Sequence, residues 1–348
     1  MTRLRALAGV LAVLVVAAAV GVCGTTAPAS YAAGPGRGTG AEDLRVQRVT
    51  VAWNGAARNK VFTRTAVVPG IGTLTLVCRP DATLVRLRAN DRSAETQMWM
   101  AKHETKNDRA VVAVKTARVY RYATAADDGR GGTGAYAGEG LNQRASIENY
   151  SSGHLDGVIS QRPGRHRPAA GVSPKPVTSF EVNWWWTGFE HPMSWRSCRI
   201  DAVLRTRLDQ RIGVSWHGAA DAARGSSQVT SVPGLGDLHL RCDAGSGGPG
   251  EPDGERSIAL VPRSPDAHVH VEQVQGEGLV EDHVEELDLP LDPETGMLGP
   301  LPLPRNGMLR LFFTVDGVQR GYVVSSYVVV NDEVRPELNV CEVAAAQL

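Results

Sequence analysis

QRVTVAWNGAA, residues Gln47–Ala57, recurs further along the chain as QRIGVSWHGAA, residues Gln210–Ala220. The two tryptophans of this match, Trp53 and Trp216, are 163 residues apart. We interpret the pair as an internal duplication. On this interpretation, residues that both copies share belong to the framework, and residues found in one copy only are candidates for function.

A second matched stretch supports the duplication. Val-Pro-Gly-Ile-Gly at residues 68–72 corresponds to Val-Pro-Gly-Leu-Gly at residues 232–236, and each leads into alternating leucines that end at Cys78 or Cys242. Proline followed by glycine suits the two central positions of a type II turn, since glycine tolerates a positive φ at the second of them. Each copy is therefore expected to turn between two strands at this point.

The hydrophobic pattern around these stretches has the period of a β-strand. Apolar residues alternate with polar or small ones, and no long stretch after the N-terminal segment has helical spacing. The same pattern predicts strands at residues 84–88, 110–122, 182–187, 308–315 and 322–330. Many short strands with Gly/Pro turns predict an all-β protein of two tandem, homologous, antiparallel β-sandwich domains of jelly-roll or Ig-like type.

The N-terminus has the pattern of a secretory signal peptide. Arg3 and Arg5 precede an apolar run of 17 residues, 6–22, and a tail of small residues follows. We expect a signal peptide over residues 1–32, a flexible linker over 33–45 and a secreted protein. An uncleaved membrane anchor is the alternative, although the run is short for a spanning helix.

Removal of the signal peptide leaves four cysteines, two in each copy. An even number in an exported chain favours disulfides, and the duplication selects the pairs Cys78–Cys198 and Cys242–Cys341. One disulfide would then close each domain, with domains at residues 46–200 and 210–343, a short linker at 201–209 and a tail at 344–348. A zinc site is the weaker reading of these cysteines, because no C-x-x-C spacing occurs.

Charge is distributed unevenly although the formal net charge is zero. Residues 34–200 carry 24 Lys and Arg against 14 Asp and Glu, whereas residues 201–348 carry 11 against 23. The halves either attract each other or one meets a charged partner. A basic loop in the first copy, with Arg162, Arg165 and Arg167, is a candidate for contact with an anionic cell-envelope polymer, and a solvated loop is its alternative. No nucleic-acid partner is expected.

Three consecutive tryptophans, residues 184–186, are a second candidate site. On a strand Trp184 and Trp186 share one face, and Trp185 lies on the other. Exposed flat aromatics stack on sugar rings and anchor interfaces, so Trp184 and Trp186 could form a carbohydrate-binding surface. Packing at a seam between the domains is the alternative interpretation.

A metal site is a third candidate. Asp266, His268, His270 and Glu272 would lie on one face of a strand, and paired imidazoles with carboxylates can bind a divalent cation. The alternative is a solvated polar face, which is ordinary for an antiparallel sheet. The first copy lacks both imidazoles.

Motifs for an activated nucleophile are absent: the sequence has no G-x-S-x-G and no H-E-x-x-H. We therefore expect an exported, non-catalytic binding or interaction protein of the cell envelope or extracellular space, without a cofactor. Its partner would be an anionic envelope polymer or a polysaccharide, and no membrane contact is expected beyond the N-terminal segment. The alternatives are a carbohydrate-binding module that uses Trp184 and Trp186, and a metal-dependent hydrolase that uses His268 and His270.

Overall fold

The structure is a computed structural model that describes residues 43–55, 61–79, 83–91, 94–106, 109–119, 136–141, 150–163, 171–172, 175–187, 192–218, 222, 226–243, 255–275, 278–281, 284–329 and 339–348. These residues belong to one compact unit, Gly40–Leu348, and are β-strand almost throughout, which confirms the predicted all-β class. The expected signal peptide lies outside the described residues. Within them, no helix has the length and apolar character needed to cross a membrane.

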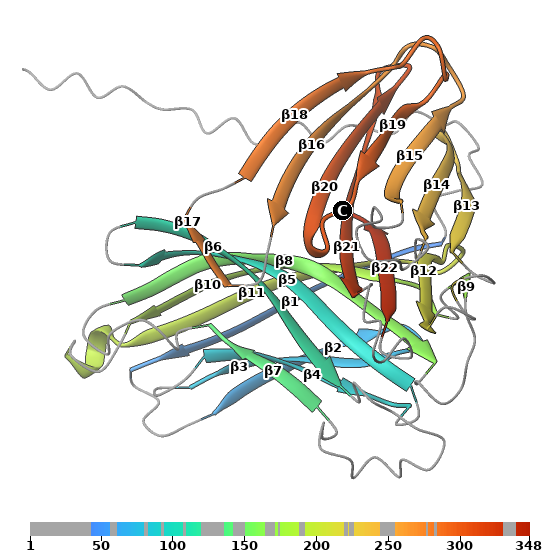
Figure 1. The fold of residues 1–348 in the computed structure, drawn as a ribbon. Helices are drawn as coiled ribbons and strands as arrows, with labels where there is room; N and C mark the ends of the chain where they lie inside the picture. Colours follow the sequence, from blue (N-terminus) through green and yellow to red (C-terminus); the bar gives the residue numbers. More distant parts are fainter. Residues whose placement is uncertain are drawn as a thin grey trace, which may run out of the picture. The chain divides into compact units, whose positions relative to one another are not determined.

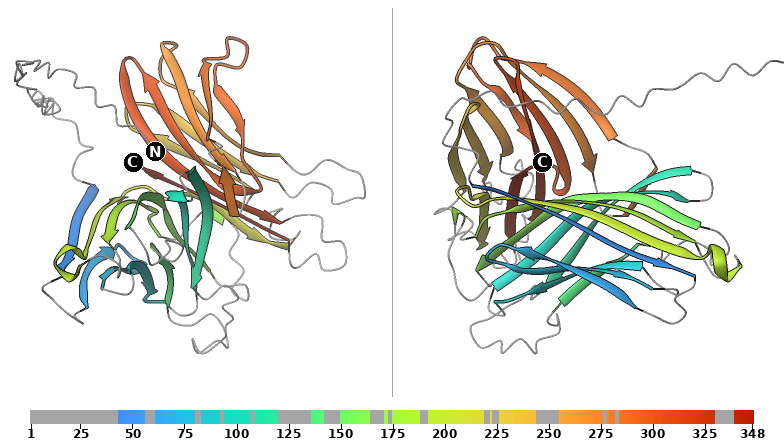
Figure 2. Two further views of the ribbon diagram at one scale, coloured as in Figure 1. Left: turned by 90° about the vertical axis from the view of Figure 1, so that its left-hand side faces the viewer. Right: turned by 180° about the vertical axis from the view of Figure 1, so that it is seen from behind.

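A first sandwich has two antiparallel sheets, visible in Figures 1 and 2 as the blue to yellow-green strands β1 to β8, β10 and β11 together with the orange edge strand β17. Its larger sheet has the order β1 (Leu44–Asn54), β11 (Ser197–Arg207), β10 (Thr178–Thr187), β8 (Tyr150–Pro163), β5 (Ala94–Lys106), β6 (Arg109–Val119) and β17 (Gly278–Glu281). Its smaller sheet has the order β2 (Phe62–Val68), β3 (Gly72–Cys78), β4 (Thr83–Ala89) and β7 (Tyr136–Gly140).

A second sandwich is built in the same way from the later part of the chain. Its larger sheet has the order β18 (Val284–Pro290), β16 (Ala267–Gln275), β20 (Asn306–Val315), β21 (Val318–Val329), β22 (Val340–Gln347), β12 (Ile212–His217) and β9 (Gly171–Val172). Its smaller sheet has the order β13 (Ser227–Val232), β14 (Gly236–Cys242), β15 (Arg256–Pro262) and β19 (Leu298–Pro302).

The two larger sheets have the same strand order once one edge strand is set aside in each. The order β1-β11-β10-β8-β5-β6 corresponds to β12-β22-β21-β20-β16-β18. The extra edge strands are exchanged: β17 of the later half pairs with β6, and the two-residue β9 of the earlier half pairs with β12. Each larger sheet therefore ends in a strand supplied by the other half of the chain.

The predicted Pro-Gly turns connect equivalent strands, β2 to β3 and β13 to β14. Gly70 has φ 71° and Gly234 has φ 84°. In each turn the N–H of the residue after the glycine donates to the carbonyl of the valine before the proline, at 3.0 Å. This is the hydrogen bond and backbone conformation of a type II turn, which only glycine adopts at this position without strain.

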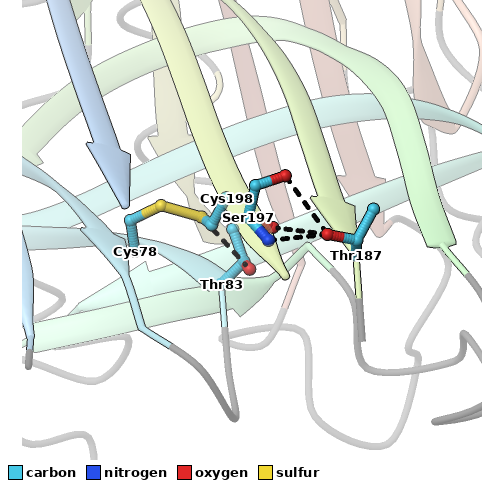
Figure 3. Close-up of a disulfide and its surroundings, with 5 residues drawn as sticks. All are labelled: Cys78, Thr83, Thr187, Ser197 and Cys198. Atoms are coloured by element: carbon cyan, nitrogen blue, oxygen red, sulfur yellow. Dashed lines mark hydrogen bonds between the residues drawn. A yellow bond between two sulfur atoms is a disulfide. The ribbon is translucent and has the colours of Figure 1, made fainter. Parts of the chain in front are cut away.

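Each disulfide joins the two sheets of one sandwich, and Figure 3 shows the one between Cys78 and Cys198. Cys78 on β3 is bonded to Cys198 on β11, and Cys242 on β14 is bonded to Cys341 on β22, as the sequence predicted. Apolar side chains from both layers fill the space around each disulfide, in two separate cores. A tryptophan is the cross-strand neighbour of the second cysteine in both sandwiches.

The outer faces of the two larger sheets contact each other through a third apolar cluster, which we call the seam. Trp99 and Tyr327 pack there with ring centroids 5.6 Å apart. The buried residues of the seam come from β5, β8 and the residue before β10 on one side, and from β16, β20, β21 and β22 on the other. They are Trp99, Ala101, Val158, Val177, Val274, Met308, Val323, Ala344 and Ala346.

Strands extend into two segments that were expected to be a linker and a tail. Strand β11 continues to Arg207, so most of the expected linker at residues 201–209 is strand. Strand β22 runs to Gln347, so the expected tail at 344–348 is also strand, with Ala345 in the second core and Ala344 in the seam. Because both faces of β22 are buried, its alanines show no alternation of polar and apolar residues that would have marked a strand.

Loss of either disulfide should destabilise the protein strongly. The closed loops span 120 and 99 residues, and the chain-entropy model gives about 4–5 kcal/mol for loops of this length, which is an upper estimate. We expect Cys78→Ala with Cys198→Ala to lower the free energy of unfolding by several kcal/mol in urea titrations. Peptide mapping without reductant should recover both pairs, and a bridge between the two sandwiches would contradict the assignment.

Candidate functional site

Strand β10 divides its three tryptophans between two environments. Trp184 and Trp186 are only 4% and 2% exposed and belong to the first core, whereas Trp185 is 44% exposed on the outer face. The carbohydrate-binding residues chosen from the sequence are therefore corrected: the buried pair has no surface for a ligand. The alternation was right, but the pattern alone did not show which face the smaller sheet covers.

Trp185 is surrounded on its sheet by polar side chains. Its neighbours on the adjacent strands are Arg199 of β11 and Ser152 of β8. Arg199 donates two hydrogen bonds to Asp201, from Nε at 2.7 Å and from Nη2 at 3.2 Å. The hydrogen bond from Arg199 lowers the pKa of the Asp201 carboxyl. The two side chains therefore form an ion pair without net charge beside the indole.

A second polar pair lies one step along the same face. The Nδ1 atom of His154 and the Oδ1 atom of Asn183 are 3.0 Å apart. Thr50 of β1 donates a hydrogen bond to Asp201 at 2.6 Å and so connects the Arg199–Asp201 ion pair to the edge strand. Cross-strand hydrogen bonds thus hold the groups around Trp185 in defined orientations.

Trp195 is the other exposed tryptophan, at 68%, and it lies in the one-turn 3-10 helix η1 (Met193–Trp195) between β10 and β11. Its carbonyl accepts a hydrogen bond of 2.8 Å from the Thr187 hydroxyl. The same hydroxyl accepts from the Ser197 N–H at 2.6 Å, as Figure 3 shows. These bonds fasten the backbone of Trp195 to the end of β10, two residues beyond Trp185.

We call Trp185, Trp195 and the polar groups around Trp185 the tryptophan surface. Apart from these two tryptophans, the exposed large hydrophobic residues of the described chain are valines and leucines. A tryptophan supplies a large, rigid and amphipathic contact area, which favours binding of a flat apolar ligand face. The sequence pattern did not single out Trp195, because nothing in the residues around it indicated its exposure.

Arg162, a candidate from the sequence for contact with an anionic polymer, is buried. It forms ion pairs with Glu95 and Glu342, the latter across the seam, where its Nε lies 3.1 Å from a Glu342 oxygen. Gln97 also donates to Glu342. Arg162 is therefore corrected from a ligand-binding residue to a seam residue. Arg165 and Arg167 lie outside the described residues.

The histidines of β16 do not converge on a shared point. His268 is exposed, and His270 pairs through Nδ1 with Asp288 of β18 at 2.8 Å. Asp266 is exposed and immediately precedes β16. In the described part of the chain, no group of three His, Cys, Asp or Glu side chains is arranged to hold a metal ion. His270 is instead a cross-strand partner in a polar face.

A cluster of acidic, histidine and arginine side chains crosses the seam near these strands. Asp156 of β8 is 1% exposed and accepts a hydrogen bond of 3.1 Å from Arg310 of β20. His103 and His154 place their Nε2 atoms 3.5 and 3.7 Å from its Oδ1. Arg310 also donates to Glu272, at 3.2 Å. A cavity of about 20 Å³ at this cluster has room for about one water molecule, so the cluster fastens the seam and does not form a substrate pocket.

Burial alone would raise the pKa of the Asp156 carboxyl. The contact with His103 and the positive charge of Arg310 outweigh burial, so the pKa lies below its ordinary value. Asp156 is therefore ionised near neutral pH and stabilises the seam in that form.

Asp156→Asn should lower the free energy of unfolding at pH 7 by about 3 kcal/mol, because removal of one partner from a buried ion pair leaves the other poorly compensated. The folded-state pKa lies below the unfolded-state value of about 3.9. The stabilisation is therefore present above that pH and is lost as the pH falls through the folded-state pKa. Urea titrations from pH 7 to 2 should show the two proteins converging. Asp237→Asn, at an exposed position, is the control and should change little.

Zinc should not bind tightly at His268 and His270. Calorimetry at neutral pH should show no sub-micromolar site, since a structural zinc ion needs four ligands. His268→Ala should change the free energy of unfolding by less than about 0.5 kcal/mol, as is usual at the surface. A one-to-one zinc isotherm that His268→Ala abolishes would contradict this expectation.

Comparisons with known proteins do not assign a family. No protein-family model matches the sequence, and no curated protein matches it. Weak matches among solved structures include the binding domain of botulinum neurotoxin DC in complex with SialylT, at 5% identity over 85% of this chain and 76% of that chain, with a TM-score of 0.10. The same domain in complex with rat synaptotagmin II matches at 6% identity over 85% and 76%, with a TM-score of 0.11. Similarity this low carries no argument about fold or function.

Proposed function

We propose that the chain is an exported, non-catalytic binding protein of the cell envelope or extracellular space, and that its partner binds the tryptophan surface. The observation that carries the proposal is the exposure of Trp185 and Trp195 at one end of a rigid sheet. Such residues dominate binding energy where they are covered by a partner. A sheet also positions ligand-binding groups more rigidly than a loop does.

Export is supported by two independent features of the chain. The N-terminal residues have the basic, apolar and small-residue order of a signal peptide. The four cysteines that remain after it form two disulfides, which persist in oxidising compartments. A signal peptide that ends near residue 32 would leave both sandwiches intact.

A duplicated origin of the two sandwiches is part of the same proposal. The shared strand order, the matched turns and the equivalent disulfides support it. The matching strand order and register make Tyr327 of β21 the counterpart of Trp185. Tyr327 packs against Trp99 in the seam, so this position is a tryptophan on an outer, exposed surface in the first copy alone. The tryptophan surface would belong to the first copy only, as expected for a site added to a shared framework.

The test is co-sedimentation of the disulfide-bonded protein, residues 33–348, with a cell-envelope fraction from the cells that produce it. We expect saturable binding that Trp185→Ala together with Trp195→Ala weakens at least tenfold, because each anchoring tryptophan contributes about 1–2 kcal/mol or more. The free energy of unfolding should change by less than about 0.5 kcal/mol, since both side chains are exposed.

Val229→Ala is the matched control, because Val229 is 61% exposed on β13 of the second sandwich. It should leave envelope binding unchanged. Equal binding by the double tryptophan variant and the wild-type protein, or no envelope binding at all, would contradict the proposal.

A further inference from the structure

The tryptophan surface has the composition of a sugar-binding site, and this inference rests on the function proposed above. We infer that it binds a neutral polysaccharide, with one sugar ring stacked on the indole of Trp185 and its hydroxyl groups held by the Arg199–Asp201 and Asn183–His154 pairs. Trp195 would contact a second part of the same polymer.

The sheet places polar groups on several sides of the indole. Arg199 and Ser152 lie beside Trp185 across the strands, about 4.8 Å away from strand to strand. Asn183 lies on the same face of β10, about 6.8 Å along the strand, which is twice the rise per residue. A ring stacked on the indole would therefore have hydrogen-bonding groups within reach of its edges.

These groups offer the hydrogen bonds that sugar hydroxyls need. A hydroxyl is both a donor and an acceptor, and the site supplies both kinds of partner. The Arg199 guanidinium retains donors beyond the two bonded to Asp201, and the Asp201 carboxylate, 39% exposed, retains lone pairs. Because the pairs are already hydrogen-bonded to each other, binding orders few side chains and costs little conformational entropy.

The local charge favours a neutral polymer over a polyanion. Along the outer face of β11, Arg199 is paired with Asp201, Arg205 with Glu181 and Arg207 with Asp209. The hydrogen bond from Arg207 also lowers the pKa of the Asp209 carboxyl. Each arginine is thus paired with an acidic neighbour, and a polyanion would find no excess of positive charge among these pairs.

A protein partner fits the surface less well. The centre of a protein interface is a contiguous apolar patch depleted of charge, whereas polar and charged side chains surround Trp185 on its sheet. An exposed aromatic ring bordered by hydrogen-bonded polar pairs suits a ligand with one apolar face and a rim of hydroxyl groups. That is the chemistry of a sugar ring.

The experiment uses native gel electrophoresis of the disulfide-bonded protein through gels that contain a glucan, a galactan, a mannan or, as the anionic comparison, polygalacturonate. We expect at least one neutral polysaccharide to retard the wild-type protein. Trp185→Ala should weaken that retardation at least tenfold in apparent affinity, whereas Trp185→Tyr should preserve part of it because a ring remains.

Asp201→Asn should weaken binding less than Trp185→Ala does, since it removes a charged hydrogen-bond acceptor but leaves the Trp185 indole in place. Val229→Ala should bind as the wild-type protein does. Retardation by polygalacturonate alone, or undiminished retardation of the Trp185→Ala variant, would overturn the inference.

Treatment of the envelope fraction with periodate or protease distinguishes this inference from the broader proposal of envelope binding. Periodate cleaves the vicinal diols of sugars, and protease digests proteins. Loss of Trp185-dependent envelope binding after periodate supports a polysaccharide, even if the panel lacks the right polymer. Loss after protease with retention after periodate would overturn the polysaccharide inference and leave the proposed binding function standing. No envelope binding of any kind would overturn both.

Discussion

The structure depends on a clamp that appears once in each sandwich. A disulfide joins the two sheets, and a tryptophan lies directly across the strand pair from its second cysteine: Trp53 opposite Cys198, and Trp216 opposite Cys341. Trp216 also donates to the carbonyl of Cys242 at 2.7 Å. The covalent bond sets the separation of the layers, and the large buried side chain fills the space beside it.

This clamp determines what the outer faces are free to do. With one face of each larger sheet committed to a core, the opposite face can pack against a neighbour or remain in solvent. In the first sandwich it does both. The part of β5 and β8 around Trp99 and Val158 is buried in the seam, whereas the end of β10 with Trp185 is exposed. A rigid sheet therefore connects a structural contact and a candidate binding surface.

The seam combines an apolar centre with buried ionic groups. Arg162–Glu342 and Arg310–Asp156 cross it with opposite polarity, each half of the chain supplying one arginine and one acid. Buried ion pairs add little net stability compared with apolar residues, but breaking one is costly. Their physical effect is therefore to favour this one alignment of the two sheets over others that an apolar seam alone would permit.

Periodicity and repetition in the sequence were sufficient for the all-β class, the type II turns and the disulfide pairing. These features depend on local backbone preference or on equivalence between two stretches of one chain. Burial of Trp184 instead of Trp185, burial of Arg162, and the seam that covers both faces of β22 were decided only by the tertiary structure. Alternation shows which side chains share a face of a strand. Which face is covered depends on strands more than a hundred residues away, and no local pattern carries that information.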